Sequence, residues 1–183
     1  MKKALKVGGI IIVILFAVGY GFREYLISQT KKASPEETIQ YTKGDTNLEV
    51  FYNRPYKKGR TIFGELVPYG ETWRTGANEA TTFETNADLN IMGKTLPKGK
   101  YTLWTVPNAT SWEVVFNDRM YLWGTGSNGA SRDPKNDVII VTVPVNTTVE
   151  TEQFTITLEE KGDQVHLNLA WDTTSVSVPI TIN

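Results

Sequence analysis

A period-two pattern of short apolar runs begins near residue 47 and leaves few folds open to the chain. Runs rich in Val, Ile, Thr and Tyr recur at short intervals, and Gly, Pro, Asn and Asp separate them. No later stretch has the sustained 3.6-residue spacing of an amphipathic helix. Strands without crossover helices predict an all-β fold, here an antiparallel β-sandwich of jelly-roll or Ig-like type. The predicted strands are 47–53, 80–86, 88–92, 99–106, 111–117, 137–145, 152–160, 164–171 and 175–182.

The clearest alternation lies in residues 153–158, where Phe, Ile and Leu alternate with Gln and Thr. The apolar side chains of such a strand face the core and the polar ones face water. Residues 164–169 repeat the alternation, and Lys161-Gly162-Asp163 between the two runs has the composition of a tight turn. We therefore predict that these two strands form a hairpin.

Composition limits the chemistry that the chain can perform. A length of 183 residues suits one domain with a short appendage, and a hydrophobic content of 40% is enough to build a core. Cysteine is absent, which excludes disulfides, thiolate metal sites and a cysteine nucleophile. His166 is the only histidine and falls on the polar face of a predicted strand. We therefore predict no cofactor, no metal site and no catalytic triad.

The N-terminal segment is basic and then strongly apolar. Val7 to Phe22 contains no charge and would form roughly 24 Å of helix, slightly less than a bilayer core of about 30 Å. Flanking apolar residues extend the membrane contact to residues 5–27. A cleaved signal peptide is one alternative, but its small-residue cut at Ala17-Val18-Gly19 would fall inside the apolar run. A retained anchor fits better.

This pattern predicts three parts of the chain. Residues 1–27 form a cytoplasmic tip and a transmembrane anchor, and residues 28–46 form a polar linker, in which Ser34 could also begin a short helix. Residues 47–183 form the exported β-domain. The expected location is the inner membrane, with a single span and the C-terminal domain in the periplasm.

Charge is distributed unevenly between these parts. Residues 1–32 hold six Lys or Arg and one Glu, a net charge of +5, whereas the remainder has a net charge of −6. An acidic body argues against a nucleic-acid partner, because phosphate neutralisation needs clustered bases. The basic end suits a membrane surface.

The stretch 54–83, RPYKKGRTIFGELVPYGETWRTGANEATTF, is typical of an ordered loop rather than a core strand. Within it, Arg74 offers a planar fork that suits a carboxylate or a phosphate. Asn78 offers a donor and an acceptor, and Glu79 would help to orient a ligand. The alternative is that Arg74 and Glu79 form an internal ion pair that fixes the loop.

Other residues extend this candidate site. Arg54 and Arg60, with two lysines between them, form either a solvated turn or an anion-binding rim. Most of the tryptophans are expected in the core, but Trp104 and Trp123 lie near strand ends beside Pro or Gly and are the expected exceptions. The loop 124–137 reads as a mobile surface loop, with a calcium site as the minor alternative.

Four carboxylates, those of Glu65, Glu71, Glu79 and Glu84, lie close together in the sequence. A pair of carboxylates about 5 to 9 Å apart can hydrolyse a glycosidic bond. Sequence alone does not supply that distance. A carbohydrate-active hydrolase with Glu79 as general acid is therefore an alternative function.

Three motifs carry a resemblance to a known family. RPYKKGRTIFG, VPYGETWRTGANEAT and LPKGKYTLWTVP occur in that order, followed by WEVVFN and a later WG. The stretch 47–182 resembles the bacterial family of domains of unknown function numbered 2911. The resemblance implies an exported or membrane-anchored protein of Gram-negative bacteria of the Bacteroidota type. The activity of the family is unassigned, so no catalytic residue follows from the resemblance.

The sequence favours a membrane-anchored binding module for a polar or anionic ligand, such as a glycan, a peptide or a small carboxylate. In this hypothesis the aromatic side chains of the site stack on the apolar part of the ligand. A hydrolase and a scaffold subunit of a membrane complex are the alternatives. The predicted ligand-binding residues are Arg74, Asn78, Glu79, Trp73, Arg54, Arg60, Tyr101 and Trp104.

Overall fold

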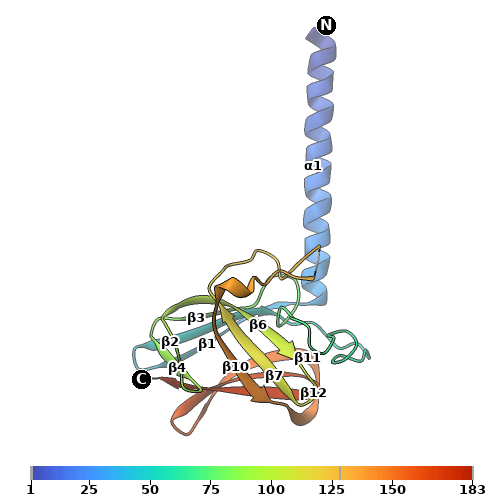
Figure 1. The fold of residues 1–183 in the computed structure, drawn as a ribbon. Coiled ribbons are helices and arrows are strands. Elements are labelled where there is room, and N and C mark those ends of the chain that lie inside the picture. The colour runs from blue at the N-terminus through green and yellow to red at the C-terminus, as the bar shows by residue number, and fades with distance from the viewer. Residues whose placement is uncertain (1, 128, 183) are drawn as a thin grey trace. The chain divides into compact units, whose positions relative to one another are not determined.

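The computed structural model describes residues 2–127 and 129–182, which divide into an N-terminal helix and a β-unit that begins at Ser34 (Figure 1). Helix α1 runs from Lys2 to Ala33. Its Gly8–Ala33 part is long and apolar enough to cross a membrane. The same length and composition also suit a signal sequence.

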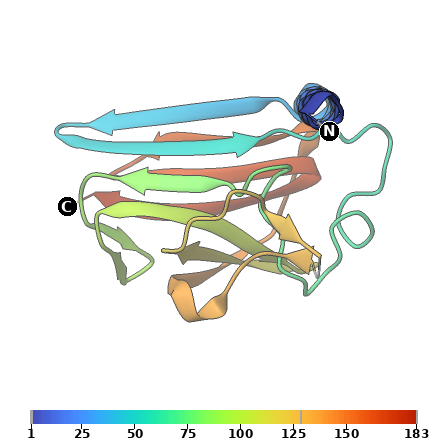
Figure 2. The same ribbon diagram turned by 90° about the horizontal axis from the view of Figure 1, so that it is seen from above.

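In the described residues of the β-unit, strands form two main antiparallel sheets (Figures 1 and 2). The first sheet has the order β1-β2-β3-β6-β7-β10 and the second has the order β11-β12-β4-β5. The strands of the first sheet are β1 Glu36–Lys43, β2 Thr46–Asn53, β3 Thr82–Thr85, β6 Gly99–Pro107, β7 Ser111–Asn117 and β10 Asp137–Pro144. Those of the second are β4 Leu89–Ile91, β5 Lys94–Leu96, β11 Asn146–Lys161 and β12 Gln164–Ile182. A small hairpin, β8 Thr125–Gly126 with β9 Gly129–Ala130, and a 3-10 helix at Pro134–Asn136 complete the unit.

The hydrophobic core lies between the two sheets, and this confirms the predicted antiparallel sandwich. Alternate residues of each strand point inward, as Leu48 and Val50 of β2 and Leu167 and Leu169 of β12 do. Among the described residues, every buried apolar side chain of this core lies between Leu48 and Ile180. Residues 34–183 therefore contain a complete core of their own.

Most of the predicted strands are present within one to three residues of their expected bounds. The predicted hairpin also forms, with Lys161 paired to Gln164 across a two-residue turn. The two strands predicted at 164–171 and 175–182 are one continuous strand, β12. It runs through Asp172, whose φ is positive, at 54°. β11 begins earlier than expected because residues 146–151 pair with the second half of β12.

The prediction that residues 28–46 form a polar linker is wrong, because the structure has helix and strand there. Helix α1 continues to Ala33, and the segment in which a short helix was considered instead begins strand β1. The side chains of Ile39 and Tyr41 pack against the core, while the residues between them are exposed. Because of this alternation, and because every residue of β1 pairs with β2, the mostly polar segment Glu36–Lys43 forms an edge strand. Only Ser34 and Pro35 separate α1 from β1.

Candidate functional site

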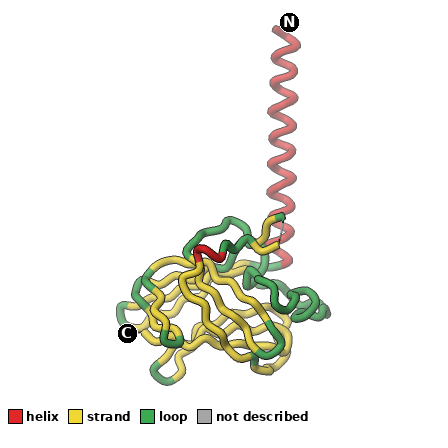
Figure 3. The backbone as a smooth tube through the Cα atoms, viewed as in Figure 1, coloured by secondary structure: helices red, strands yellow, loops and turns green. Residues whose placement is uncertain are grey.

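The segment between β2 and β3, residues 54–81, has almost no regular structure (Figure 3). Backbone hydrogen bonds nevertheless tie it to the sandwich at several points. Trp73 N donates to Thr105 O over 2.7 Å, and Thr105 N donates back to Trp73 O over 3.0 Å. Gly64 N donates to Val67 O at 2.9 Å and closes a turn. These bonds give the segment the rigid shape that the sequence predicted.

The basic residues at the start of this segment are used inside the protein. The Arg54 guanidinium lies 3.0 Å from Glu37, and it also donates to Phe154 O and to the Thr155 hydroxyl in β11. Lys57 forms ion pairs with Glu150 of β11 and Asp172 of β12, both in the second sheet, at 2.6 and 2.7 Å. These contacts hold the two sheets together at one edge.

Arg60 also bonds within the protein, because its side chain donates to the backbone oxygens of Tyr56 and Lys57 in its own loop. The bonds of Arg54 join the two sheets, and those of Arg60 favour the alternative of a solvated turn. The anion-binding rim stays a prediction.

Two of the aromatic side chains predicted to stack on a ligand are inaccessible. Trp104 is fully buried on the outer side of β6, where it packs with Ala80 and Val115 beneath Tyr121. Its indole N–H donates to the Thr102 hydroxyl at 2.9 Å. The chain after β7 folds back over this part of the sheet and covers it. The prediction for Trp104 is therefore wrong.

Tyr101 points into the main core and is also buried, with its hydroxyl donating to Pro97 O at 2.6 Å. It cannot stack on a ligand. Trp73 is half-buried, and its ring stacks on Trp171 with centroids 5.9 Å apart. Trp123 is exposed, as the sequence predicted.

The polar residues Asn78 and Glu79 converge on Asn53, a fully buried residue at the end of β2. Asn78 Nδ2 donates to Asn53 Oδ1 at 3.3 Å, and Asn53 Nδ2 donates to Glu79 Oε2 at 3.0 Å. Asn78 and Thr75 both adopt positive φ, which is unusual outside glycine. These contacts show that Asn78 and Glu79 help to fix the loop. Sequence reasoning missed Asn53, because a lone Asn at a strand end carries no signal.

Gly76 is required at the centre of this loop. Its φ is +151°, and a Cβ there would lie 2.8 Å from Asn53 O. The hydroxyl of Thr81 donates to Thr75 O at 2.7 Å and closes the loop from the other side. The backbone that leads into and out of Arg74 is therefore held at several points.

Arg74 differs from its neighbours in this loop. Its Nε is buried without a hydrogen-bond partner. Within residues 2–127 and 129–182, no hydrogen bond or ion pair involves its side chain, so the alternative of an Arg74–Glu79 pair is wrong. Burial lowers the pKa of the guanidinium from its ordinary value. An unpaired guanidinium that is partly removed from water is costly, so its retention calls for an explanation.

The stem of Arg74 is positioned by Gly124. A Cβ at residue 124 would lie 2.3 Å from Arg74 Cδ and 2.6 Å from Arg74 Cβ. Gly124 N in turn donates to Asn78 O at 3.0 Å, so the two loops are tied together beside the arginine. The WG pair at residues 123–124 was the sequence signal for this contact, although its role could not be read from it.

A pocket of about 180 Å³ opens beside Arg74. One wall comes from the segment before Arg74 and the other from the β8–β9 hairpin. Among the described residues that line it, Arg74 is the only cation and Glu71 the only anion. The lining residues are Leu66, Val67, Pro68, Glu71, Thr72, Trp73, Arg74, Thr125, Gly129 and Ala130.

A second arginine lies close to this pocket but is neutralised. Arg132 forms a two-bond pair with Asp137, with contacts of 2.5 and 3.1 Å, and also donates to the Thr72 hydroxyl at 3.2 Å. The contrast with Arg74 is direct. Arg132 has a carboxylate partner in the protein and Arg74 has none in the described residues.

A family model for a protein of unknown function, DUF2911, matches residues 34–180 of the chain. The chain belongs to the DUF2911 family. The matched range begins at the first residue of the β-unit and ends within β12, so the DUF2911 domain and the β-sandwich coincide. Comparison with curated proteins and with solved structures returned no match.

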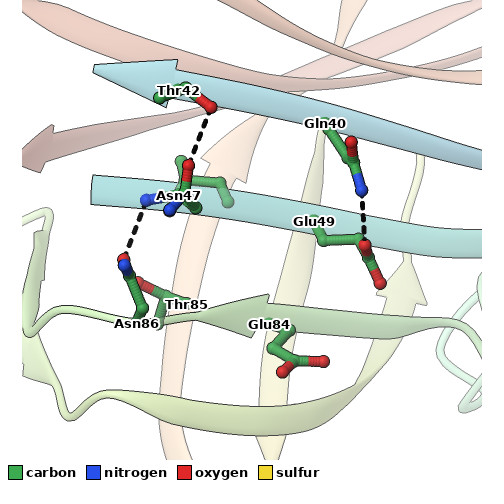
Figure 4. A pocket seen from close by; sticks show the side chains of 8 residues that line it. Gln40, Thr42, Asn47, Glu49, Glu84, Thr85 and Asn86 are labelled. Atoms are coloured by element: carbon green, nitrogen blue, oxygen red, sulfur yellow. Dashed lines mark hydrogen bonds between the residues drawn. The ribbon is translucent and has the colours of Figure 1, made fainter. Parts of the chain in front are cut away.

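The DUF2911 domain also has a polar groove of about 290 Å³ on the outer face of β1, β2 and β3 (Figure 4). Its side chains mostly satisfy one another. Gln40 donates to Glu49 at 2.8 Å, and Thr42 donates to Asn47 at 2.8 Å. Glu84, opposite Glu49, pairs with a lysine of β6 at 2.9 Å. Among the described residues Glu49 has no cation partner, so this groove is anionic and lacks the unpaired cation that distinguishes the Arg74 pocket.

The four carboxylates of the hydrolase hypothesis are not brought together in any described pocket of the DUF2911 domain. Glu71 lines the Arg74 pocket, and Glu84 lines the polar groove. Glu79 accepts a hydrogen bond from Asn53, and Glu65 is exposed. The geometry that paired-carboxylate hydrolysis requires has no support among these residues.

Proposed function

We propose that the DUF2911 domain is a non-enzymatic binding module, and that Arg74 pairs with a carboxylate or phosphate group of its ligand. The observation that carries this proposal is the Arg74 guanidinium, which has no partner in the described protein and lines a pocket. A ligand anion would supply the missing charge-assisted hydrogen bonds, two of them in parallel in the best geometry.

The surroundings of Arg74 support binding because they are rigid before a ligand arrives. The backbone after Arg74 is locked by Asn53 and Thr81, and the side-chain stem rests on Gly124. A preorganised cation loses little conformational freedom on binding, so more of the interaction energy appears as affinity. The desolvation of Arg74 was already incurred when the domain folded.

We further propose that α1 remains as a single-span anchor in the inner membrane and holds the domain in the periplasm. The apolar part of α1 is sufficient in length. Lys2, Lys3 and Lys6 favour a cytoplasmic N-terminus, and Arg23, Lys31 and Lys32 beyond the apolar run weaken this charge asymmetry.

Binding can be tested on residues 34–183, which contain the described core. The Nε–H signal of Arg74 would be followed by NMR during separate titrations with acetate and with inorganic phosphate. We expect a saturable shift of this signal for at least one anion, while the Nε–H signal of the paired Arg132 stays in place. No shift of the Arg74 signal with either anion would contradict the proposal.

A scaffold role in a membrane complex is a separate proposal that a different measurement addresses. It predicts that the full chain, extracted in mild detergent, co-purifies with other membrane proteins in fixed proportion. A monomeric full chain without associated proteins would argue against that role. Neither result bears on the Arg74 pocket.

A further inference from the structure

We propose that the ligand of the Arg74 pocket is a monocarboxylate at the end of an apolar acyl chain. This inference rests on the proposed function, because it identifies the class of anion that the same pocket takes. The carboxylate would pair with Arg74, the first methylenes would fill the pocket, and the remainder of the chain would lie on exposed apolar side chains outside it.

The charges at the pocket favour an anion that carries a single negative charge. Arg74 is the only cation among the described lining residues, and Glu71 lines the same pocket. Arg132 contributes no net positive charge, because Asp137 neutralises it. A dianionic phosphate would bring a second negative charge toward Glu71, and like charges at short range repel one another. A carboxylate matches the one available cation.

The size of the pocket shows how much of a ligand it can hold. A volume of about 180 Å³ is below the range of roughly 300–1,000 Å³ that is usual for small-molecule sites. The pocket therefore holds the carboxylate and the first methylenes of an acyl chain. A longer ligand must continue across the surface.

The walls and rim of the pocket are suited to hydrocarbon. Leu66, Val67 and Pro68 form one wall, and Leu66 is 44% exposed. Leu122 and Trp123 immediately precede Gly124, which touches Arg74; they are 95% and 39% exposed. Leu66 places exposed apolar area in the pocket that Arg74 lines, and the two exposed side chains before Gly124 are the candidates to extend this amphipathic surface. An acyl carboxylate has the matching distribution of charge and apolar area.

A glycan or a peptide fits the same surface less well. Both present many hydrogen-bonding groups that need partners when they leave water. The wall formed by Leu66, Val67 and Pro68 offers no polar side chain. The Thr72 hydroxyl already accepts a hydrogen bond from Arg132. Thr125 and Glu71 are the other polar side chains of the lining besides Arg74, too few for the many polar groups of a glycan or a peptide, so an acyl chain is the better match.

The test compares straight-chain monocarboxylates of increasing length, from acetate to decanoate, each below its micellar concentration. Dissociation constants would be measured on residues 34–183 by calorimetry, and the Arg74 Nε–H signal would report the site of binding. We expect the affinity to rise about fourfold for each methylene that is buried. We expect alkyl phosphates of equal length to bind more weakly at a pH where they are dianionic.

Substitutions of exposed apolar residues test where the acyl chain of the ligand lies on the protein surface. Leu66→Ser and Leu122→Ser should weaken decanoate about fivefold or more and leave acetate unchanged. Val149→Ser, at an exposed apolar position in β11, is the matched control and should alter neither.

If acetate shifts the Arg74 signal but affinity does not depend on chain length, the acyl inference fails and the proposed function stands. If short peptides or oligosaccharides bind more tightly than decanoate, the inference also fails. If no anion shifts the Arg74 signal, both fail.

Discussion

Gly124 lies directly against the side chain of Arg74, so closely that a Cβ at residue 124 would be 2.3 Å from Arg74 Cδ. The glycine is not part of a turn with positive φ, so its role is to leave space rather than to bend the backbone. It comes from the chain after β7, whereas Arg74 precedes β3. The position of the guanidinium is thus set jointly by two segments that are distant in sequence.

This contact predicts that Gly124→Ala displaces Arg74 and impairs anion binding. We expect at least a tenfold loss of affinity for acetate, because the stem of the arginine must move away from its present path. Overpacking would also lower the free energy of unfolding by about 1–3 kcal/mol. Calorimetric titration and urea unfolding would measure the two effects. Gly126→Ala in the adjacent hairpin has only a 3.8 Å contact and should change neither. Equal effects of the two variants would contradict this role of Gly124.

Arg54 and Arg74 should differ in what they contribute to stability. Arg54→Met removes the bonds to Glu37, Phe154 and Thr155 from a half-buried site, and we expect a loss of about 2 kcal/mol. Arg74→Met keeps an apolar stem and removes an unpaired charge, so the unfolding free energy should be unchanged or higher. Urea unfolding of both variants is the measurement. A comparable loss in Arg74→Met would show that the protein itself stabilises that guanidinium.

The rigidity of the loop depends on Gly76. Gly76→Ala would place a methyl group 2.8 Å from Asn53 O at a φ of +151°, and we expect a loss of about 3 kcal/mol or more. Gly162→Ala is the control, because Gly162 also has positive φ but nothing lies within 4 Å of its Cβ position. Backbone strain alone should cost the control about 1 kcal/mol. Thermal unfolding that ranks the two in the opposite order would contradict the steric argument.

Stability should fall at alkaline pH, partly through Tyr52. Burial, and then the hydrogen bond to Glu37 over 2.5 Å, raise the pKa of the Tyr52 hydroxyl above its ordinary value of 10.0. A raised folded-state pKa stabilises the fold fully below about pH 10, and this contribution is lost as pH rises further. Urea unfolding between pH 7 and pH 11 would measure the fall.

Tyr52→Phe is the variant that isolates this contribution. It removes the acceptor of the Ile156 N–H bond and should cost about 1–2 kcal/mol at pH 7. Its stability should then fall less steeply above pH 10 than that of the wild type. Some fall would remain, because burial also raises the pKa of Tyr101. Parallel curves for the two proteins would contradict the assignment to Tyr52.

The sequence was a good guide to the sandwich because period-two alternation marks a half-buried strand directly, as in the β11–β12 hairpin. It failed at β1, where Pro35 and the three charged residues of the strand obscure the inward positions of Ile39 and Tyr41. An edge strand needs only a few apolar side chains, so its pattern is weak.

The site was only partly predictable for a different reason. Side-chain chemistry identified arginine as the key residue type, but it could not show which arginine would lack a partner. Arg54 is satisfied by Phe154 and Thr155, which are 100 and 101 positions away along the chain. Likewise, Trp104 is buried only because the chain after β7 returns over it. Such contacts depend on tertiary structure that no local pattern records.

A crystal structure of residues 34–183 grown with butyrate would test the central claim most directly. We predict a butyrate carboxylate within hydrogen-bonding distance of the Arg74 guanidinium, with the methylenes against Leu66 and Val67. The Asn53, Asn78 and Glu79 contacts should be unchanged. An empty pocket with Arg74 paired to Glu71 or Glu79 would contradict the account, because the arginine would then be part of the protein's own ion-pair structure.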